Sequence, residues 1–367
     1  MSEVEKPVEK IKWGVVATVR EPADLVLAFV AHHLELGADE IVLYLDDSED
    51  EVFPILRRTG KVRAVRCDWR YWDRLTDGKG RPGNQNQRQA KNATQAYKTT
   101  KCDFLIHLDA DEFLYMARPI EEEVARLEGD ECWLRVPAME RCWQAGNRDE
   151  SIFGGVFRSQ IRNAPKVVRN IYGDEVVPFL SHGLAGAAHG KPLVRVGEQV
   201  SLQVHAAKLP GKNTGWAPHR RATGLTVLHF DGLTPLHWVA KTLRYAEQDD
   251  AAIDDLLHDA RARQVRAARD LMGSMPELLR FFRQITGLSP EQASALTAHG
   301  KLAALEFDPA AAVKRVFPDH AADYSFRAFD LKLGTENARR LMKVIGAPPR
   351  RRRPEGTPKA GTASPVG

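Results

Sequence analysis

The chain has 367 residues, 43% of them hydrophobic, which is enough to bury the core of one large α/β domain with additions. Its 53 basic and 49 acidic residues give a formal charge of +4, and four of the basic residues are the consecutive arginines 350–353. This near balance argues against a nucleic-acid binder, because such proteins rely on a broad basic surface.

The cysteines and the apolar segments restrict the class further. Cys67, Cys102, Cys132 and Cys142 have no C-x-x-C spacing, so we expect neither a thiolate zinc site nor a disulfide framework. The charged N-terminus lacks the apolar core of a secretory signal, and no apolar run reaches the roughly 18 residues of a membrane span. We therefore expect a cytoplasmic protein with reduced thiols, and peripheral contact with the inner face of the membrane stays open.

The first hundred residues alternate between predicted strands and helices. An apolar strand over 12–19 is followed by an amphipathic helix that opens near Pro22 and ends at Gly37, and by a second apolar strand over 40–45. The later elements are a helix over 51–59, a strand over 62–65, a loop over 68–86, a helix over 87–99 and a strand over 104–108. Apolar strands alternating with helices are typical of a mostly parallel, Rossmann-type sheet with helices on both faces.

The pattern changes beyond Glu112. Short strands are predicted over 131–137, 194–196, 201–204 and 225–228, and helices over 235–260, 262–285, 289–304 and 335–345. We therefore divide the chain into an N-terminal extension (1–10), an α/β domain (11–234), a helical C-terminal region (235–347) and a disordered basic tail (348–367).

Three acids follow the apolar strand 104–108: Asp109, Asp111 and Glu112. Ligands of open α/β sheets bind outside the carboxyl ends of the strands, and alternate residues of an extended chain point the same way, so Asp109 and Asp111 can share a site. Two carboxylates this close favour a Mg²⁺ or Mn²⁺ ion that also binds substrate phosphates. The alternative is an acidic strand end that caps the next helix, and Glu112 fits either a partner of the site or such a cap.

Several segments in order resemble glycosyltransferase family 2, of the GT-A type, in its bacterial branch without membrane helices. They are VVATVREPADLVLAFVAHHLELGADEIVLYLDDSED at 15–50, RQAKN at 88–92, HLDADEFL at 107–114, GKPLVRVG at 190–197, VHAAK at 204–208 and LHFDGLTPLHWVAKTLRY at 228–245. The resemblance implies a GT-A-like fold and transfer of a sugar from a nucleotide-sugar donor, with UDP-sugar favoured, to a glycan or glycolipid acceptor. It also implies inversion, and a place in bacterial surface polysaccharide or glycoconjugate synthesis.

The resemblance implies roles for particular residues. The metal would be held by Asp109, Asp111 and His229. The donor would contact Thr18, Arg20, Glu21, Asp47, Arg88, Gln89, Asn92, Asp109, Lys191, Arg195 and Lys241. An inverting enzyme needs a general base, for which the candidates are Asp231, Glu140 and Asp174. The alternatives are structural: a turn residue for Asp47, and a solvated helix face for Arg88, Gln89 and Lys241.

Two other functions compete with this interpretation. A nucleotidyl or phosphosugar transferase also uses acids and a divalent metal, but often has a Gly-rich phosphate loop after the first strand, and residues 18–22 contain no glycine. A non-catalytic glycan-binding protein on the same fold would stack its tryptophans on sugars. The cluster Trp69, Tyr71 and Trp72 fits either an acceptor platform or ordinary packing.

Overall fold

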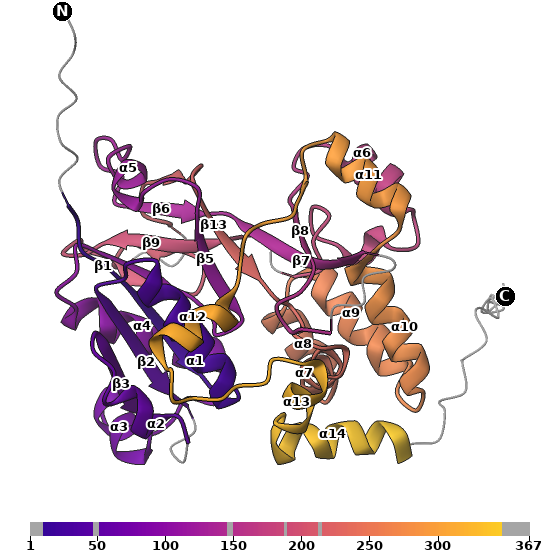
Figure 1. The fold of residues 1–367 in the computed structure, drawn as a ribbon, viewed down its shortest axis with the longest axis horizontal. Helices are drawn as coiled ribbons and strands as arrows, with labels where there is room; N and C mark the ends of the chain where they lie inside the picture. The colour runs from indigo at the N-terminus through magenta and orange to yellow at the C-terminus, as the bar shows by residue number, and fades with distance from the viewer. Residues whose placement is uncertain (1–9, 47–50, 145–149, 187–188, 212–214, 347–367) are drawn as a thin grey trace, which may run out of the picture.

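The computed structural model describes residues 10–46, 51–144, 150–186, 189–211 and 215–346. One group of strands comprises β1 (Trp13–Val19), β2 (Glu40–Leu45), β3 (Val62–Arg66), β4 (Phe104–His107), β6 (Trp133–Val136), β9 (Lys191–Arg195) and β12 (His219–Arg221). They form a seven-stranded sheet in the order β12-β6-β9-β4-β1-β2-β3, seen on the left of Figure 1. Only β9 runs against the other six, so the predicted mostly parallel sheet is confirmed.

Both faces of this sheet are covered by helices, as predicted. Val15 and Ala17 of β1 pack into the same core as α1 (Ala23–Glu35), whereas Val16 packs into the core of α4 (Gln85–Thr99) on the other face. Successive side chains of a strand point to opposite faces, so a strand covered on both sides is apolar throughout.

A second sheet lies beside the first. Its strands are β5 (Glu112–Met116), β7 (Ala138–Gln144), β8 (Val156–Ser159), β13 (Leu225–His229) and β15 (Leu302–Ala303), in the order β15-β8-β7-β13-β5, and β14 (Gly287–Leu288) pairs with β7. A separate hairpin is formed by β10 (Ser201–Leu202) and β11 (Ala207–Lys208). Because β5 follows β4 directly, the chain passes from one sheet to the other at Asp109 and Asp111.

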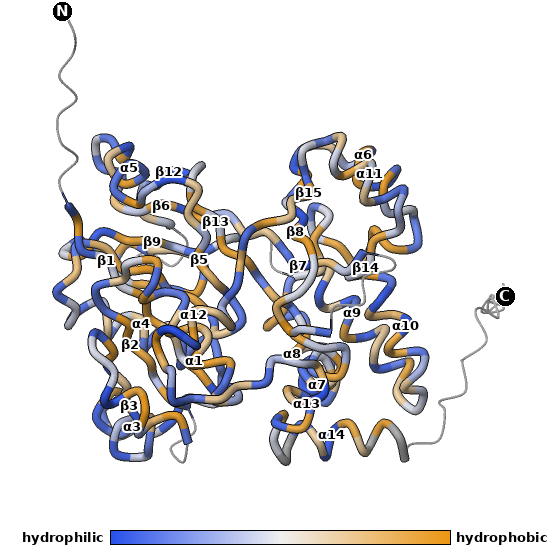
Figure 2. The backbone as a smooth tube through the Cα atoms, viewed as in Figure 1, coloured by the Kyte–Doolittle hydropathy of each residue, from blue (hydrophilic) through white to orange (hydrophobic). Residues whose placement is uncertain are grey.

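The remaining elements are mostly helices. The short ones before residue 180 are α2 (Phe53–Leu56), α3 (Trp69–Leu75), α5 (Ile120–Val124), α6 (Pro165–Tyr172) and the 3₁₀ helix η1 (Val177–Phe179). The C-terminal series is α7 (Pro235–Ala246), α8 (Asp250–Leu256), α9 (Asp259–Asp270), α10 (Met275–Thr286), α11 (Pro290–Ala298), α12 (Pro309–Val316), α13 (Phe326–Leu331) and α14 (Gly334–Gly346). Orange and blue alternate along α10 in Figure 2, as expected of a helix with one buried face. The predicted helical C-terminal region is thus confirmed, with more breaks than predicted.

The chain returns to the first sheet after residue 304. Ala312, Val313 and Phe317 are buried in the core that contains α1, and α12 packs along α1. Arg315 lies 2.5 Å from Glu35 of α1. The core of the first sheet therefore crosses the expected boundary at residue 234, and the division of the chain at that point stays a prediction.

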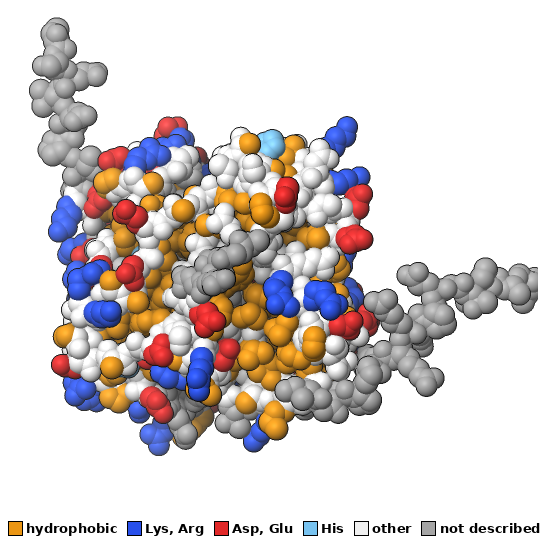
Figure 3. All heavy atoms as spheres, turned by 45° about the vertical axis from the view of Figure 1, so that its right-hand side comes forward, with side chains coloured by type: hydrophobic (Ala, Val, Ile, Leu, Met, Phe, Trp, Pro, Cys, Tyr) orange, Lys and Arg blue, Asp and Glu red, His pale blue; other side chains and the backbone are white. Residues whose placement is uncertain are grey.

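The surface carries both signs of charge. Acidic and basic side chains are interspersed over the face shown in Figure 3, in keeping with the small net charge. The four cysteines are buried and have free thiols. Within the described ranges, we find no helix with both the length and the apolar character needed to cross a membrane.

Candidate donor-binding site

The acidic residues lie in a short turn at the carboxyl edge of the larger sheet. The Asp109 amide donates to the Glu112 carboxylate at 2.9 Å, and the Glu112 amide donates to the Asp109 carbonyl at 3.0 Å. The amide of Phe230, just after β13, donates to the Asp111 carbonyl at 3.0 Å. The turn is therefore fixed by its own acids and by the end of a strand from the second sheet.

Two lysines from distant parts of the chain neutralise these acids. The Lys191 ammonium, at the start of β9, lies 2.6 Å from Asp109 and 2.8 Å from Glu112, and its side chain is 1% exposed. The Lys241 ammonium, on α7, lies 2.6 Å from Asp111. Burial by itself would raise the pKa of Asp109 and of Asp111, but the two cations lower each pKa below its ordinary value. Both acids are therefore ionised and paired.

Helix α4 brings three of the expected donor contacts to the same edge. Gln89 donates a hydrogen bond from its amide to Asp109. Asn92 donates to the Thr18 hydroxyl, at the end of β1, at 2.9 Å. Arg88 instead lies 3.0 Å from Asp46 at the end of β2 and bonds two carbonyls of the preceding loop, so it joins this loop to the sheet.

Glu21 lies at the same edge, just after β1. Its carboxylate is 3.9 Å from the ring of His237, and burial lowers the pKa of that histidine to about 3, so the ring is neutral. Burial, together with the negative charge of Asp111, raises the pKa of Glu21 to about 7. A carboxyl group with such a pKa can accept a proton near neutral pH, a role that the sequence did not suggest for Glu21.

His229 ends β13 in register with Glu112 on one neighbouring strand and Glu140 on the other. Residues in register share one face of a sheet, so the ring lies among carboxylates. A Cβ at Gly186 would stand 2.7 Å from the His229 ring and 2.9 Å from the Glu140 carboxylate, which shows how closely the three residues pack.

Two of the three candidate general bases already have buried partners. Glu140 is 1% exposed and lies 2.5 Å from Arg158. Asp231 lies 2.9 Å from Arg261 and accepts a hydrogen bond from the Trp238 ring at 3.2 Å. Burial would raise the pKa of Asp231, but the charge of Arg261 lowers it below its ordinary value. Both carboxylates are therefore buried ion-pair partners, and their assignment as the general base stays a prediction.

The remaining predicted residues lie in different places. Asp174 is 80% exposed and pairs with Arg169 at the surface, and its assignment as a base stays a prediction. Arg195 sits beside the amino end of β4, roughly 13 Å along β9 from Lys191 at about 3.3 Å per residue, and its contact with the donor stays a prediction. Arg20 is exposed just beyond β1. Asp47 lies outside the described residues.

The sequence-predicted loop over 68–86 contains a helix, α3, that contributes to the site. Asp68 caps it by accepting the Tyr71 amide at 2.8 Å, a start signal that the sequence carried. The Tyr71 hydroxyl donates to Asn92 at 2.5 Å, and Trp72 is fully buried. These two rings therefore pack against the protein at the carboxyl edge of the larger sheet and do not form an open platform. Trp69, in contrast, is 72% exposed.

The expected metal ligands lie together but are not arranged as a metal centre. Asp109, Asp111 and His229 share one edge, yet each aspartate already holds a lysine ammonium. Among the described residues, no three His, Cys, Asp or Glu side chains converge as ion ligands would. The residues as placed do not fit a divalent cation, because an ion would have to displace both lysines.

Comparison with known proteins gives only distant likenesses. Neither a family model nor a curated protein matches the chain. TarS (residues 1–349) from S. aureus is 11% identical, with 71% of this chain and 70% of that chain covered and a TM-score of 0.26. HddC from Yersinia pseudotuberculosis is 8% identical (60% and 93% covered, TM-score 0.30), and the galactosyltransferase LgtC is 13% identical (50% and 58%, TM-score 0.22). Identities of 8–13% and TM-scores of 0.22–0.30 are too low to assign a function to this chain.

Proposed function

We propose that the protein is a glycosyltransferase that moves a sugar from a nucleotide-diphosphate sugar, with UDP-sugar favoured, to an acceptor hydroxyl with inversion. The observation that carries this proposal is the meeting of Asp109, Asp111 and Lys241 at the carboxyl edge of a mostly parallel sheet, where such sheets bind ligands. The ordered resemblance of residues 11–245 to family 2 supports it. A cytoplasmic role in bacterial surface polysaccharide or glycoconjugate synthesis belongs to the same proposal.

Lys241 is the cation that a diphosphate can reach, because its side chain is 24% exposed. Lys191 is almost fully buried and holds Asp109 and Glu112 in place. When the sugar–oxygen bond breaks, negative charge grows on the leaving diphosphate, and a cation already in position stabilises that charge. Thr18 and Gln89 lie at the same edge as hydrogen-bonding groups for the donor, and the fully buried Asn92 holds the Thr18 hydroxyl in place.

Glu21 is the general base of this proposal. It lies close enough to Asp111 and Lys241 for their charges to influence its pKa, and its pKa of about 7 lets it exist as a carboxylate or a carboxylic acid near neutral pH. Glu21 takes the proton of the acceptor hydroxyl as the new bond to the sugar forms.

The sequence predicts Mn²⁺ or Mg²⁺ at Asp109, Asp111 and His229, and we keep this as the second form of the proposal because the three side chains share one edge. In that form, Asp109, Asp111 and His229 would hold the ion, which would supply positive charge beside the diphosphate once the two lysines had moved away. We derive no step through the ion. The two forms differ in one measurable respect, which is whether the nucleotide binds in the presence of EDTA.

The test is calorimetric titration of UDP and of GDP, in EDTA and in Mn²⁺, into the wild type, Lys241→Met and Asp111→Asn. We expect UDP to bind in EDTA and Lys241→Met to weaken it by about 1.5–3 kcal/mol, the usual contribution of a hydrogen bond to a charged group. The control is Lys98→Met, an exposed lysine at the far end of α4. Binding only with Mn²⁺, lost in Asp111→Asn, would support the metal form, and no binding under any condition would overturn both forms.

A further inference from the structure

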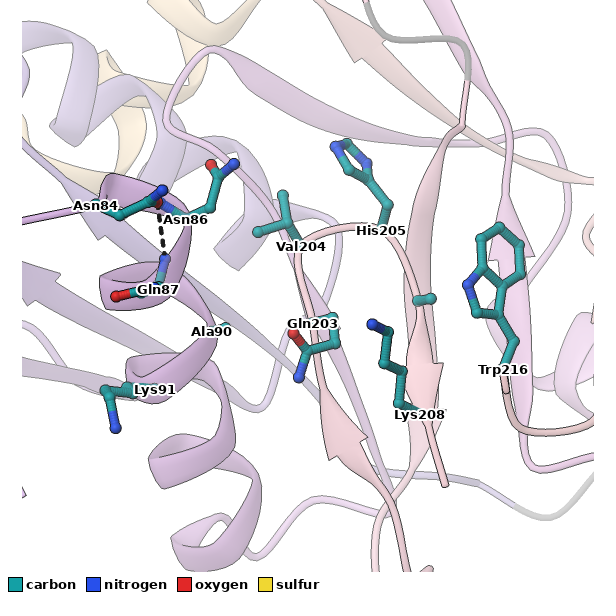
Figure 4. A pocket seen from close by; sticks show the side chains of 11 residues that line it. Asn84, Asn86, Gln87, Ala90, Lys91, Gln203, Val204, His205, Lys208 and Trp216 are labelled. Carbon is teal, nitrogen blue, oxygen red and sulfur yellow. Dashed lines mark hydrogen bonds between the residues drawn. The ribbon is translucent and has the colours of Figure 1, made fainter. Parts of the chain in front are cut away.

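A pocket of about 470 Å³ lies between the first turns of α4 and the β10–β11 hairpin (Figure 4). Asn86 and Gln87 line it from the helix, and Gln203 and Lys208 from the hairpin. Trp216, which is 39% exposed, also lines the pocket. The lining thus combines amide groups, a cation and an aromatic ring, the side chains that recognise a sugar.

Both walls of the pocket continue into the donor site. On α4, Asn86 lines the pocket, and Gln89, three residues further on and so a neighbour on the helix surface, bonds Asp109. On the hairpin side, the ring of His205 lines the pocket and lies 2.9 Å from the carbonyl of Gly190, the residue before Lys191. A molecule in the pocket therefore lies next to the acids of the donor site.

The charged residues that line the pocket are all basic. Its lining includes Lys91 and Lys208 but no Asp or Glu. In the part of the chain that the structure describes, neither lysine forms an ion pair or a hydrogen bond through its side chain, and the same holds for the amides of Asn86 and Gln87. Donors without protein partners beside a hollow are available to a ligand, and an ammonium group without a counter-charge favours an anion.

We propose that this pocket binds an acidic sugar residue of the acceptor, whose carboxylate or phosphate group pairs with Lys208, the lysine that points from the hairpin toward α4 (Figure 4). Trp216 offers its ring to the apolar face of the sugar, and Asn86 and Gln87 offer hydrogen bonds to its hydroxyls. The assignment of this sugar to the acceptor rests on the proposed function, because an acceptor has to lie beside the donor.

The test follows the Trp216 signal in fluorine NMR of protein labelled with 5-fluorotryptophan. The chain has 7 tryptophans, and Trp216→Phe identifies the signal of interest. We expect glucuronate or glucose 6-phosphate to shift this signal at about tenfold lower concentration than glucose, since an ion pair of about 1.4 kcal/mol changes affinity tenfold. Comparing the two anions shows whether a carboxylate or a phosphate is preferred. The variant Lys208→Gln should abolish the preference, and Lys98→Gln should retain it.

The outcomes separate this proposal from the proposed function. No shift with either anion overturns the pocket assignment, and so does a preference for anions that survives in the Lys208→Gln variant. UDP titration of the same samples tests the donor site independently. UDP binding without a sugar-induced shift overturns the pocket alone, whereas a shift without UDP binding supports an acidic-sugar site and overturns the glycosyltransferase. The other tryptophan signals report whether each variant is folded.

Discussion

Lys191 contacts two carboxylates, Asp109 and Glu112, in a place that water hardly reaches. Methionine keeps much of its length but leaves both acids without a cation, so we expect Lys191→Met to lower the free energy of unfolding by about 3–5 kcal/mol. Urea unfolding followed by circular dichroism measures this change. The matched control is Arg169→Met, which breaks a solvent-exposed pair with Asp174 and should cost less than about 1 kcal/mol. Similar losses in the two variants would contradict the structural role of Lys191.

Glu21 gives the activity its expected dependence on pH. Burial raises its pKa from 4.5 to about 7, so the carboxylate that accepts the proton is formed as the pH rises through 7. Activity should therefore increase across this range, and Glu21→Gln should lose the increase together with about 10²–10⁴-fold in kcat. Release of UDP from a UDP-sugar, with water as the acceptor, measures both effects. Glu122→Gln, an exposed acid on α5, is the control. A rise near pH 7 that persists in Glu21→Gln would assign the base elsewhere.

Part of this site could be predicted from the sequence, and part could not. Asp109 and Asp111 follow an apolar strand, and this local pattern places them at a sheet edge without any further information. Their partners are 82 and 130 residues away in the sequence, and no local pattern reveals which lysine meets which acid. The raised pKa of Glu21 has the same origin, because burial by distant segments causes it.

At the scale of elements, Gly190, the residue before β9, positions Lys191 at the start of that strand. Gly190 has φ +76°, and a Cβ there would stand 2.2 Å from the Val136 carbonyl of β6. We expect Gly190→Ala to destabilise the fold by more than the roughly 1–2 kcal/mol of left-handed strain, and to weaken UDP binding by moving Lys191. Gly197, beyond the other end of β9, has φ +97° and open space around it, so Gly197→Ala isolates the strain alone. Urea unfolding measures the stability of both variants, and UDP titration measures their affinity for the nucleotide. Equal effects of the two substitutions would contradict a special role for Gly190 in positioning Lys191.

Apolar strands were predicted correctly, whereas a strand with buried charged residues was missed. β1, β2 and β4 are apolar runs covered on both faces, so their sequences identify them. β7 was missed because it contains Glu140 and Arg141, two charged residues that the fold buries with partners from other segments. The predicted helix over 235–260 is two helices, since Asp249 caps α8 by accepting the Ala252 amide at 2.8 Å.

At the scale of the whole molecule, residues after 304 complete the core of the first sheet. A chain ending at residue 304 would lose α12 and with it Val313 and Phe317, exposing the apolar surface of α1. We expect this truncated chain to melt at a lower temperature and to bind a hydrophobic dye. A chain ending at residue 346 keeps all the described residues and serves as the control. Equal melting temperatures would show that residues 11–304 are stable without this cover.

The contact between α1 and α12 also has a consequence during translation, because α12 is synthesised long after α1. Arg315 follows its partner Glu35 by 280 residues, so at about 5–20 residues per second the ribosome adds the second residue roughly 15–60 s after the first. During this interval, the outer face of α1 has emerged and its cover has not. A nascent chain in this state exposes an apolar helix face of the kind that chaperones bind, and the length of this state depends on how fast the 280 residues from Glu35 to Arg315 are translated.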